Sequence, residues 1–127
     1  MTIPGFIGGA REAGKDPDAM ERAILVWYSV DPDYEKAVNG MRFWAGVLVP
    51  AMFRYAVVSP REIEMHANLV SREAIEKAFL VATDAEGVIQ EMERYIDAGI
   101  NHFCLGNSSP DVQHGIEIFR DIIPHFR

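Results

Sequence analysis

Two continuous apolar runs mark strands in an otherwise amphipathic chain. Residues 23–30 (AILVWYSV) are apolar and rich in β-branched side chains, and residues 102–106 (HFCLG) form a second such run. Runs of this length without polar alternation are typical of strands buried on both faces of a parallel sheet. Residues 31–101 have helical character, with an apolar stripe over residues 88–96 that ends at Gly99. The pattern predicts the order strand, several helices, strand, helix.

Proline and hydroxyl or carboxylate side chains predict where the helices begin. In four places a side chain that can accept from free backbone N–H groups precedes a proline, whose missing N–H costs nothing at the first helical position. Ser71 and Thr83 predict two more starts, and the spacings Ser59-x-x-Glu62 and Thr83-x-x-Glu86 are capping-box patterns. An N-terminal helix should end near Gly14. The sequence thus predicts five to six helices; the four proline-marked starts are Asp16-Pro17, Asp31-Pro32, Ser59-Pro60 and Ser109-Pro110.

Composition and charge narrow the function classes. The 127 residues are 49% hydrophobic, without repeat or linker, and predict a single domain over residues 1–127. A net charge of −7 with scattered basic residues disfavours nucleic acid and anionic membranes as partners. The longest apolar stretch, residues 45–53, is too short for a membrane span. The single Cys104 and the lack of a signal-peptide pattern predict a reducing, cytoplasmic location.

Two parallel strands form only a piece of a sheet. Strands this apolar need neighbours on both edges and cover on both faces. Either the chain pairs with copies of itself or with another polypeptide, or it is part of a larger α/β protein. The natural larger protein is a (β/α)8 barrel of about 250 residues.

Six short motifs, in order, resemble the C-terminal part of luciferase-like oxidoreductases that use the deazaflavin coenzyme F420. The similarity is greatest to the glucose-6-phosphate dehydrogenase branch, and it extends from about residue 10 to the end of the chain. Their order and spacing together carry the resemblance. The motifs are Asp31-Pro32-Asp33, Arg42-Phe43-Trp44-Ala45, Ser59-Pro60-Arg61-Glu62, Val81-Ala82-Thr83-Asp84, Gly99-Ile100-Asn101-His102 and Pro124-His125-Phe126-Arg127.

The resemblance implies a helix-rich partial (β/α)8 barrel containing the seventh strand (residues 23–30) and the eighth strand (residues 102–106). The six preceding strands, which carry most of the family's cofactor-binding and catalytic groups, have no counterpart here, so no catalytic residue can be assigned. The implied cofactor is F420, and no metal is expected. A cationic site for a substrate phosphate in the family corresponds to Arg54, with Lys77 beside the position of a second family cation. The departure at Ala78, where the family has that second cation, puts glucose 6-phosphate itself in doubt.

Each candidate site residue has a structural alternative. Arg54, between Phe53 and Tyr55, either binds an anion or covers aromatic surface with its stem. The end of the last strand (Gly106, Asn107, Ser108 and Ser109) is either the rim of a pocket at a helix N-terminus or a helix cap made by Ser109.

Three further features favour structural roles. Glu62 and His66 have the i, i+4 spacing of a metal pair but no third ligand. Cys104 in mid-strand is expected to be buried and inert. The aromatic side chains of Trp27, Tyr28, Phe43 and Trp44 could line a pocket for a flat ring, but core packing is the simpler expectation.

Two functions remain open. The chain is either the C-terminal segment or subunit of an F420-dependent oxidoreductase, incomplete as a catalyst alone and acting on a small substrate, with or without a phosphate, or it is a non-catalytic α/β module. The first predicts a missing N-terminal barrel portion as partner. The second predicts homo-oligomerisation through strand edges or through apolar helix faces around residues 45–53.

Overall fold

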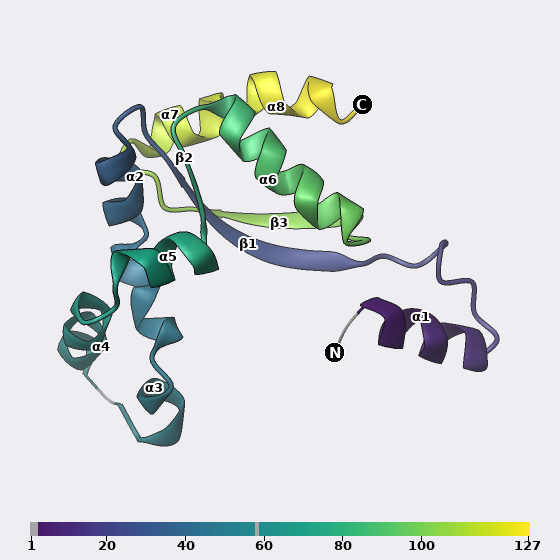
Figure 1. Ribbon diagram of the computed structural model, residues 1–127, viewed down its shortest axis with the longest axis horizontal. Helices are drawn as coiled ribbons and strands as arrows, with labels where there is room; N and C mark the ends of the chain where they lie inside the picture. The colour runs from purple at the N-terminus through teal and green to yellow at the C-terminus, as the bar shows by residue number, and fades with distance from the viewer. Residues whose placement is uncertain (1–2, 58) are drawn as a thin grey trace.

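A three-stranded parallel sheet forms the centre of the molecule in the computed structural model, which describes residues 3–57 and 59–127 (Figure 1). The strand order is β2-β1-β3, so the two long strands are direct neighbours and the third lies on the opposite edge. The strands are β1 (Ala23–Val30), β2 (Leu80–Ala82) and β3 (His102–Asn107).

The described residues contain eight α-helices and one 3-10 helix, more than the five to six helices expected. Several are short, because the segment of helical character between the two predicted strands is broken by turns and by η1. The helices are α1 (Ile3–Glu12), α2 (Tyr34–Gly40), η1 (Arg42–Leu48), α3 (Ala51–Arg54), α4 (Pro60–Asn68), α5 (Arg72–Ala78), α6 (Ala85–Asp97), α7 (Val112–Glu117) and α8 (Phe119–His125). None of the helices in these ranges combines the length and the apolar character that a membrane span requires.

Both predicted strands are present with the expected bounds, and β3 is one residue longer than its run. The strand β2 was not predicted: its three residues lie in the segment 31–101, for which the sequence predicted helices. It pairs with the last three residues of β1, from Tyr28 to Val30. β3 pairs with β1 over its whole length, from Ala23 opposite His102 to Tyr28 opposite Asn107.

Several predicted helix starts were wrong, and no helix begins at Asp16-Pro17. Residues 13–22 contain no helix, and the Asp16 carboxylate instead accepts from the N–H of Asp18 in a turn. The caps expected at Asp31, Thr83 and Ser109 lie one or two residues later, where the Oδ1 atoms accept from N–H groups of the first helical turn. The observed capping residues there are Asp33, Asp84 and Asp111.

Other predicted helix boundaries were confirmed. Ser71 caps α5 through Ala74 N–H, at 3.2 Å. α4 begins at Pro60, although the Ser59 side chain makes no capping bond. Gly14 and Gly99 follow α1 and α6 with φ of 69° and 101°, in the left-handed region that favours glycine.

Alternation along β1 sends its side chains into two different environments. Val26, Tyr28 and Val30 pack with helices α6 and α8 in the main hydrophobic cluster. Trp27 points to the other face and packs against a second cluster that η1, α2, α4 and α5 build around Met41 and Ile75. The helices η1, α3, α4 and α5 thus form a lobe beyond the strand ends, and Figure 1 shows it separate from the layer of α6, α7 and α8.

Candidate functional site

The carboxyl ends of the three parallel strands meet beside the lobe, where barrel enzymes keep their chemistry. The loop after β3 is held there by its own side chains and backbone. Ser108 N–H donates to the Tyr28 carbonyl at 2.8 Å, and Ser108 Oγ donates to the Gly40 carbonyl at 2.7 Å. Asn107 Oδ1 accepts from Ser109 N–H, and Asn107 Nδ2 donates to the Val112 carbonyl. The side chains of the predicted rim are therefore engaged within the fold.

Ser109 has a different role from the one predicted. Ser109 is 4% exposed, and its hydroxyl accepts from Val30 N–H at 3.0 Å, which links the end of β1 to the loop after β3. The cap of α7 is the carboxylate of Asp111, which accepts from His114 N–H at 3.0 Å. The expectation that Ser109 caps the last helix was wrong because a partner distant in sequence occupies its oxygen.

Two glycines let the neighbouring helices close onto this loop. A Cβ at Gly40 would lie 2.5 Å from both the Ser108 carbonyl oxygen and Ser29 Oγ. A Cβ at Gly115 would lie 2.5 Å from Ser109 Oγ. Ser29 is fully buried, and its hydroxyl makes no hydrogen bond to the described residues. The loop is therefore packed from both sides, and Gly106 to Ser109 as a ligand-binding rim stays a prediction.

An aromatic ladder runs from the sheet into the lobe. The Trp27 ring lies over Gly106 of β3, where a Cβ would come within 2.3 Å of the ring. Trp27 stacks on Trp44 of η1 with ring centroids 3.7 Å apart, and Phe43 meets Trp44 edge-to-face at 5.2 Å. Phe43 is 77% exposed, so the expectation that it belongs to the core was wrong. The ladder forms an apolar wall next to the strand ends.

Below the ladder, the same face of the sheet lies open. Leu25 is 62% exposed, although it is apolar and sits in the middle of β1. Its register partner Cys104 is also exposed, contrary to the expectation of a buried thiol. This open face, which we define as Ala23, Leu25, His102 and Cys104, faces away from α6 and α8 because the alternate residues fill their cluster.

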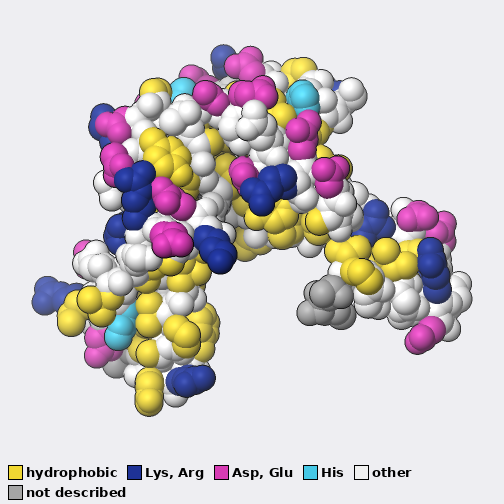
Figure 2. All heavy atoms as spheres, in the orientation of Figure 1, with side chains coloured by type: hydrophobic (Ala, Val, Ile, Leu, Met, Phe, Trp, Pro, Cys, Tyr) yellow, Lys and Arg dark blue, Asp and Glu magenta, His cyan; other side chains and the backbone are white. Residues whose placement is uncertain are grey.

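The two predicted anion-binding cations belong to helices α3 and α5 and not to the strands of this face. Arg54 ends α3 and is exposed, with Phe53 and Tyr55 exposed on either side. Figure 2 shows the hydrophobic side chains of this part of the lobe gathered around α3 and α4. Lys77 is exposed on α5 and lines a cavity of about 560 Å³ between α5, β2 and α6, which Arg54 does not line. The structure does not bring the two cations together in that cavity.

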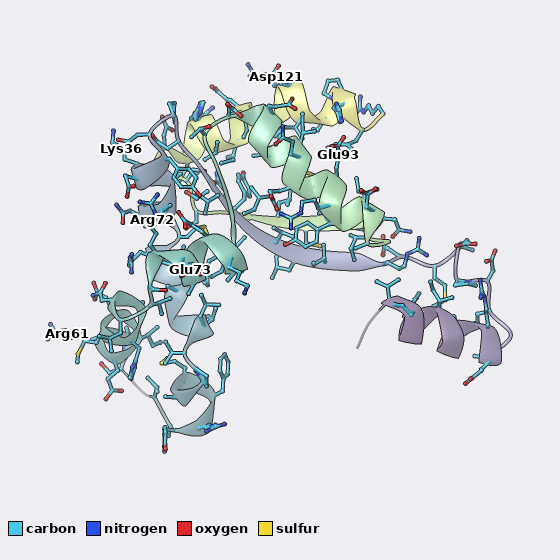
Figure 3. All side chains as sticks on the ribbon, viewed as in Figure 1. Lys36, Arg61, Arg72, Glu73, Glu93 and Asp121 are labelled. Atoms are coloured by element: carbon cyan, nitrogen blue, oxygen red, sulfur yellow. The ribbon has the colours of Figure 1, made fainter. Side chains whose placement is uncertain are left out.

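The cavity beside Lys77 is surrounded by paired charges. Arg72, labelled in Figure 3, bonds to Glu76 at 2.7 Å and also to Glu35, and hydrogen bonds to these carboxylates raise its pKa. Burial, and then the charge of Glu76, raise the pKa of the Tyr34 hydroxyl at the same cavity. Glu91 is likewise paired with Arg94 at 2.8 Å. The cavity that Lys77 lines is therefore bordered by both acidic and basic side chains.

The sequence-based prediction missed that the residues of the open face lie on one side of the sheet, although the two strand patterns contain that information. The run at residues 23–30 was interpreted as apolar throughout, but its alternate positions Leu25 and Trp27 share the environment of Cys104 and Gly106, while the others share the main core. A parallel register between the two predicted strands would have placed these side chains together.

In the part of the chain that the structure describes, no group of three or more His, Cys, Asp or Glu side chains gathers as a metal site.

Comparison with known proteins gives this geometry a context. No protein-family model matches the chain. The chain is 32% identical over 126 residues to an F420-dependent glucose-6-phosphate dehydrogenase from Nocardia farcinica, and 33% identical to the enzyme of that name from Mycolicibacterium gilvum. Each match covers 98% of this chain and 38% of the relative, so the chain spans well under half the length of the curated relatives it matches.

A solved structure is more similar still. It is an F420-dependent secondary alcohol dehydrogenase in complex with an F420-acetone adduct, with 62% identity and a TM-score of 0.88. Our chain covers 38% of that enzyme, and 98% of our chain is matched. The homologues of this chain are F420-dependent oxidoreductases. It corresponds to the C-terminal part of such an enzyme.

The F420-dependent oxidoreductases also account for the fold. The coenzyme F420 dependent tetrahydromethanopterin reductase from Methanopyrus kandleri is only 23% identical but superposes with a TM-score of 0.76. The three-stranded sheet and its helices are a partial (β/α)8 barrel of the luciferase-like fold, as the sequence predicted. β1 and β3 are parallel neighbours, as the strands assigned as seventh and eighth must be.

Proposed function

We propose that this chain supplies one wall of the active site of an F420-dependent oxidoreductase, whose remaining strands come from a further polypeptide segment. The observation that carries the proposal is the open face: a leucine 62% exposed in mid-strand beside an exposed cysteine is what one sector of a barrel interior presents when its neighbours are absent. The aromatic ladder continues this wall toward the strand ends.

The substrate class we infer is a small uncharged secondary alcohol or its ketone. The wall consists of Leu25, Trp27, Trp44 and Phe43, which offer apolar surface without a cation. The 62% identical dehydrogenase is described as acting on secondary alcohols, which supports the same inference. A phosphorylated sugar is the second candidate, supported by Arg54 and Lys77 and by the more distant glucose-6-phosphate dehydrogenases.

The described residues fit the deazaflavin as an apolar contact surface on one side, and not as a site that encloses it. The apolar ladder suits contact with a flat ring, whereas the side chains of Asn107, Ser108 and Ser109 bond within the fold and leave little for a phosphate. When bound, the deazaflavin supplies the hydride acceptor or donor. This chain's own residues exclude water from one side of that reaction and contact the apolar part of the substrate.

The test combines the chain with the rest of the structurally similar dehydrogenase, the 62% of that enzyme that this chain does not match. We expect the chain alone to leave F420 absorbance unchanged and the mixture to reduce F420 with 2-propanol. Leu25→Glu should abolish this activity, because it places a carboxylate in the apolar wall. Lys36→Glu, an exposed change on α2 (Figure 3), is the matched control and should retain it.

Three outcomes separate the candidates. Activity with glucose 6-phosphate but not with 2-propanol would favour the phosphorylated substrate. Equal activity of the Leu25→Glu and Lys36→Glu mixtures would remove the open face from the active site. A mixture that never binds F420, although both components are folded by circular dichroism, would contradict the proposal as a whole.

A further inference from the structure

A separate cavity, which we call the lobe cavity, lies in the lobe between η1 and α4. Its volume is about 410 Å³, within the usual range of small-molecule sites. The two helices approach closely at Gly46, where a Cβ would lie 2.9 Å from the Ile63 side chain. The walls of the lobe cavity therefore come from two helices of this chain, and they involve none of the strand edges of the sheet.

Apolar side chains line much of the lobe cavity. Phe43 comes from η1, and Pro60, Ile63 and Ala67 come from α4. Phe43 meets Trp44 edge-to-face and stays 77% exposed, and Ile63 is 39% exposed. An apolar group that enters the cavity removes this surface from water, which favours binding.

Two arginines bring positive charge to the same cavity. Arg42 donates from Nη1 to the Val70 carbonyl at 2.8 Å, which fixes its guanidinium and leaves further N–H donors for a ligand. Arg61 also lines the cavity, and its side chain extends from α4 toward solvent in Figure 3. Among the described residues, no ion pair joins either arginine to a carboxylate. Both charges are thus available to an anion.

The charge balance of the lobe cavity favours an anion with one negative charge. Glu64 is the carboxylate that lines it, so Arg42 and Arg61 leave one net positive charge. The chain as a whole carries a net charge of −7, so the local charge here is opposite in sign. A carboxylate presents two oxygens to the fork of an arginine, and the Asn68 amide adds a neutral donor.

We propose that the lobe cavity binds a small carboxylate with an aromatic or branched apolar body. The apolar body covers Phe43 and Ile63, the carboxylate accepts from Arg42, and Arg61 turns inward to complete the charge pairing. The site shares Phe43 with the aromatic ladder but does not rest on the proposed function, because it involves neither F420 nor the open face. Glucose 6-phosphate has no apolar body of this kind and carries more negative charge, so it is not a ligand of this site.

Calorimetric titration of the chain with phenylacetate tests the proposal. We expect a dissociation constant of about 0.1–1 mM, an affinity typical of a ligand of this size. Acetate lacks the apolar body and benzyl alcohol lacks the charge, so both should bind at least about 10-fold more weakly. Tryptophan emission should change on adding phenylacetate, because Trp44 contacts Phe43.

Exposed residues of the lobe cavity allow variants that stay folded. Arg61→Glu should raise the dissociation constant of phenylacetate at least about 10-fold, since it replaces an attractive charge with a repulsive one. Arg120→Glu makes the same change on α8, outside the cavity, and should alter that constant less than about 2-fold. Glu64→Gln should lower it about 2–5-fold, because it removes the carboxylate that competes for the arginines. Phe43→Ala should remove the preference for phenylacetate over acetate.

Three results would overturn the proposal. The first is a chain that is folded by circular dichroism and gives no binding heat with millimolar phenylacetate. The second is an equal dissociation constant for phenylacetate and benzyl alcohol, which would show that the arginines do not bind the ligand. The third is an equal loss for Arg61→Glu and Arg120→Glu, which would mean that only the total charge of the chain matters. Each measurement uses the chain without F420, so it is independent of the test of the oxidoreductase.

Discussion

Gly106 is the residue on which the aromatic ladder depends. A Cβ there would lie 2.3 to 2.7 Å from three atoms of the Trp27 ring, so Gly106→Ala must tilt the ring away from Trp44. We expect a loss of about 1–3 kcal/mol in the free energy of unfolding, the usual cost of overpacking. Urea unfolding followed by tryptophan fluorescence measures it, and the native emission should also change.

Gly8 provides the matched control for this substitution. A Cβ at Gly8 meets no atom within 4 Å, and the residue lies inside α1. Gly8→Ala should be neutral or stabilise by up to about 1 kcal/mol, because alanine favours the helix. Equal destabilisation by the two substitutions would show that the Trp27 contact is not the cause.

Tyr28 makes the free energy of unfolding depend on pH in the alkaline range. Burial raises its pKa above the ordinary value of 10.0, and its hydroxyl donates to the Gly115 carbonyl at 2.9 Å. Above that value the unfolded chain loses the phenolic proton before the folded chain does, so the free energy of unfolding falls as pH rises. Tyr28→Phe should cost about 0.5–1.5 kcal/mol at neutral pH.

The difference between the wild type and Tyr28→Phe should shrink when chemical unfolding is repeated above pH 10, because the variant has no proton to lose at this position. Curves that stay parallel over the whole range would mean that Tyr28 does not contribute to the alkaline loss.

Arg54 tests the phosphorylated substrate. If its guanidinium binds the anion, Arg54→Ala should weaken binding of glucose 6-phosphate to the assembled enzyme by about 1.5–3 kcal/mol, the value of a charged hydrogen bond. Calorimetric titration measures this. Arg61→Ala removes an exposed arginine of the neighbouring α4 and should have no effect. An unchanged titration for Arg54→Ala would leave the uncharged alcohol as the candidate substrate.

At the scale of single elements, the helix caps can be compared directly. Asp111 accepts from His114 N–H at the start of α7, whereas Ser59 at the start of α4 makes no capping bond. Asp111→Ala should therefore lower the free energy of unfolding by about 0.5–2 kcal/mol, and Ser59→Ala should change it far less. Asp111→Asn should recover most of the loss. Similar losses at both positions would indicate that side-chain capping does not explain these helix starts.

The caps also show how far local sequence rules reach. The local sequence rules predicted that helices begin near residues 31 and 109. In the structure, Asp31 Oδ1 accepts from Asp33 N–H in a turn, and the Ser109 hydroxyl accepts from Val30 N–H, which is distant in sequence. In both places an aspartate two residues later caps the helix. A local pattern predicts the approximate position of a helix start, whereas tertiary contacts decide which of two nearby side-chain oxygens caps the helix.

The strands show the same division between local and tertiary information. β1 and β3 were predicted because runs of eight and five mostly apolar residues are typical of strands in a buried sheet. β2 is too short for such a signal and exists because it can pair with the end of β1. The exposure of Leu25 and Cys104 could not be predicted from the apolar runs, because it depends on what covers the second face of the sheet.

At the scale of the whole molecule, stability should be concentrated in the sheet and its two clusters. α1 stands apart from the sheet in Figure 1, and its link to the rest includes Ile3 beside Gly99. Ile122, by contrast, is 1% exposed in the main cluster. We therefore expect removal of residues 1–12 to lower the free energy of unfolding less than the single substitution Ile122→Ala, which should cost about 2–5 kcal/mol.

Hydrogen exchange gives the same comparison without any substitution. Tyr28 is the residue of β1 that pairs with both β2 and β3, and the amides from Tyr28 to Val30 should exchange slowest because these residues pair with β2 and are buried. The amides of α1 should exchange at rates close to those of an unfolded chain. Slow exchange in α1 would mean that the helix is covered in solution by something beyond its own chain. α1 is amphipathic, with an apolar stripe made of Ile3, Phe6, Ile7 and Ala10. Such protection should therefore appear only when the remaining barrel strands are added.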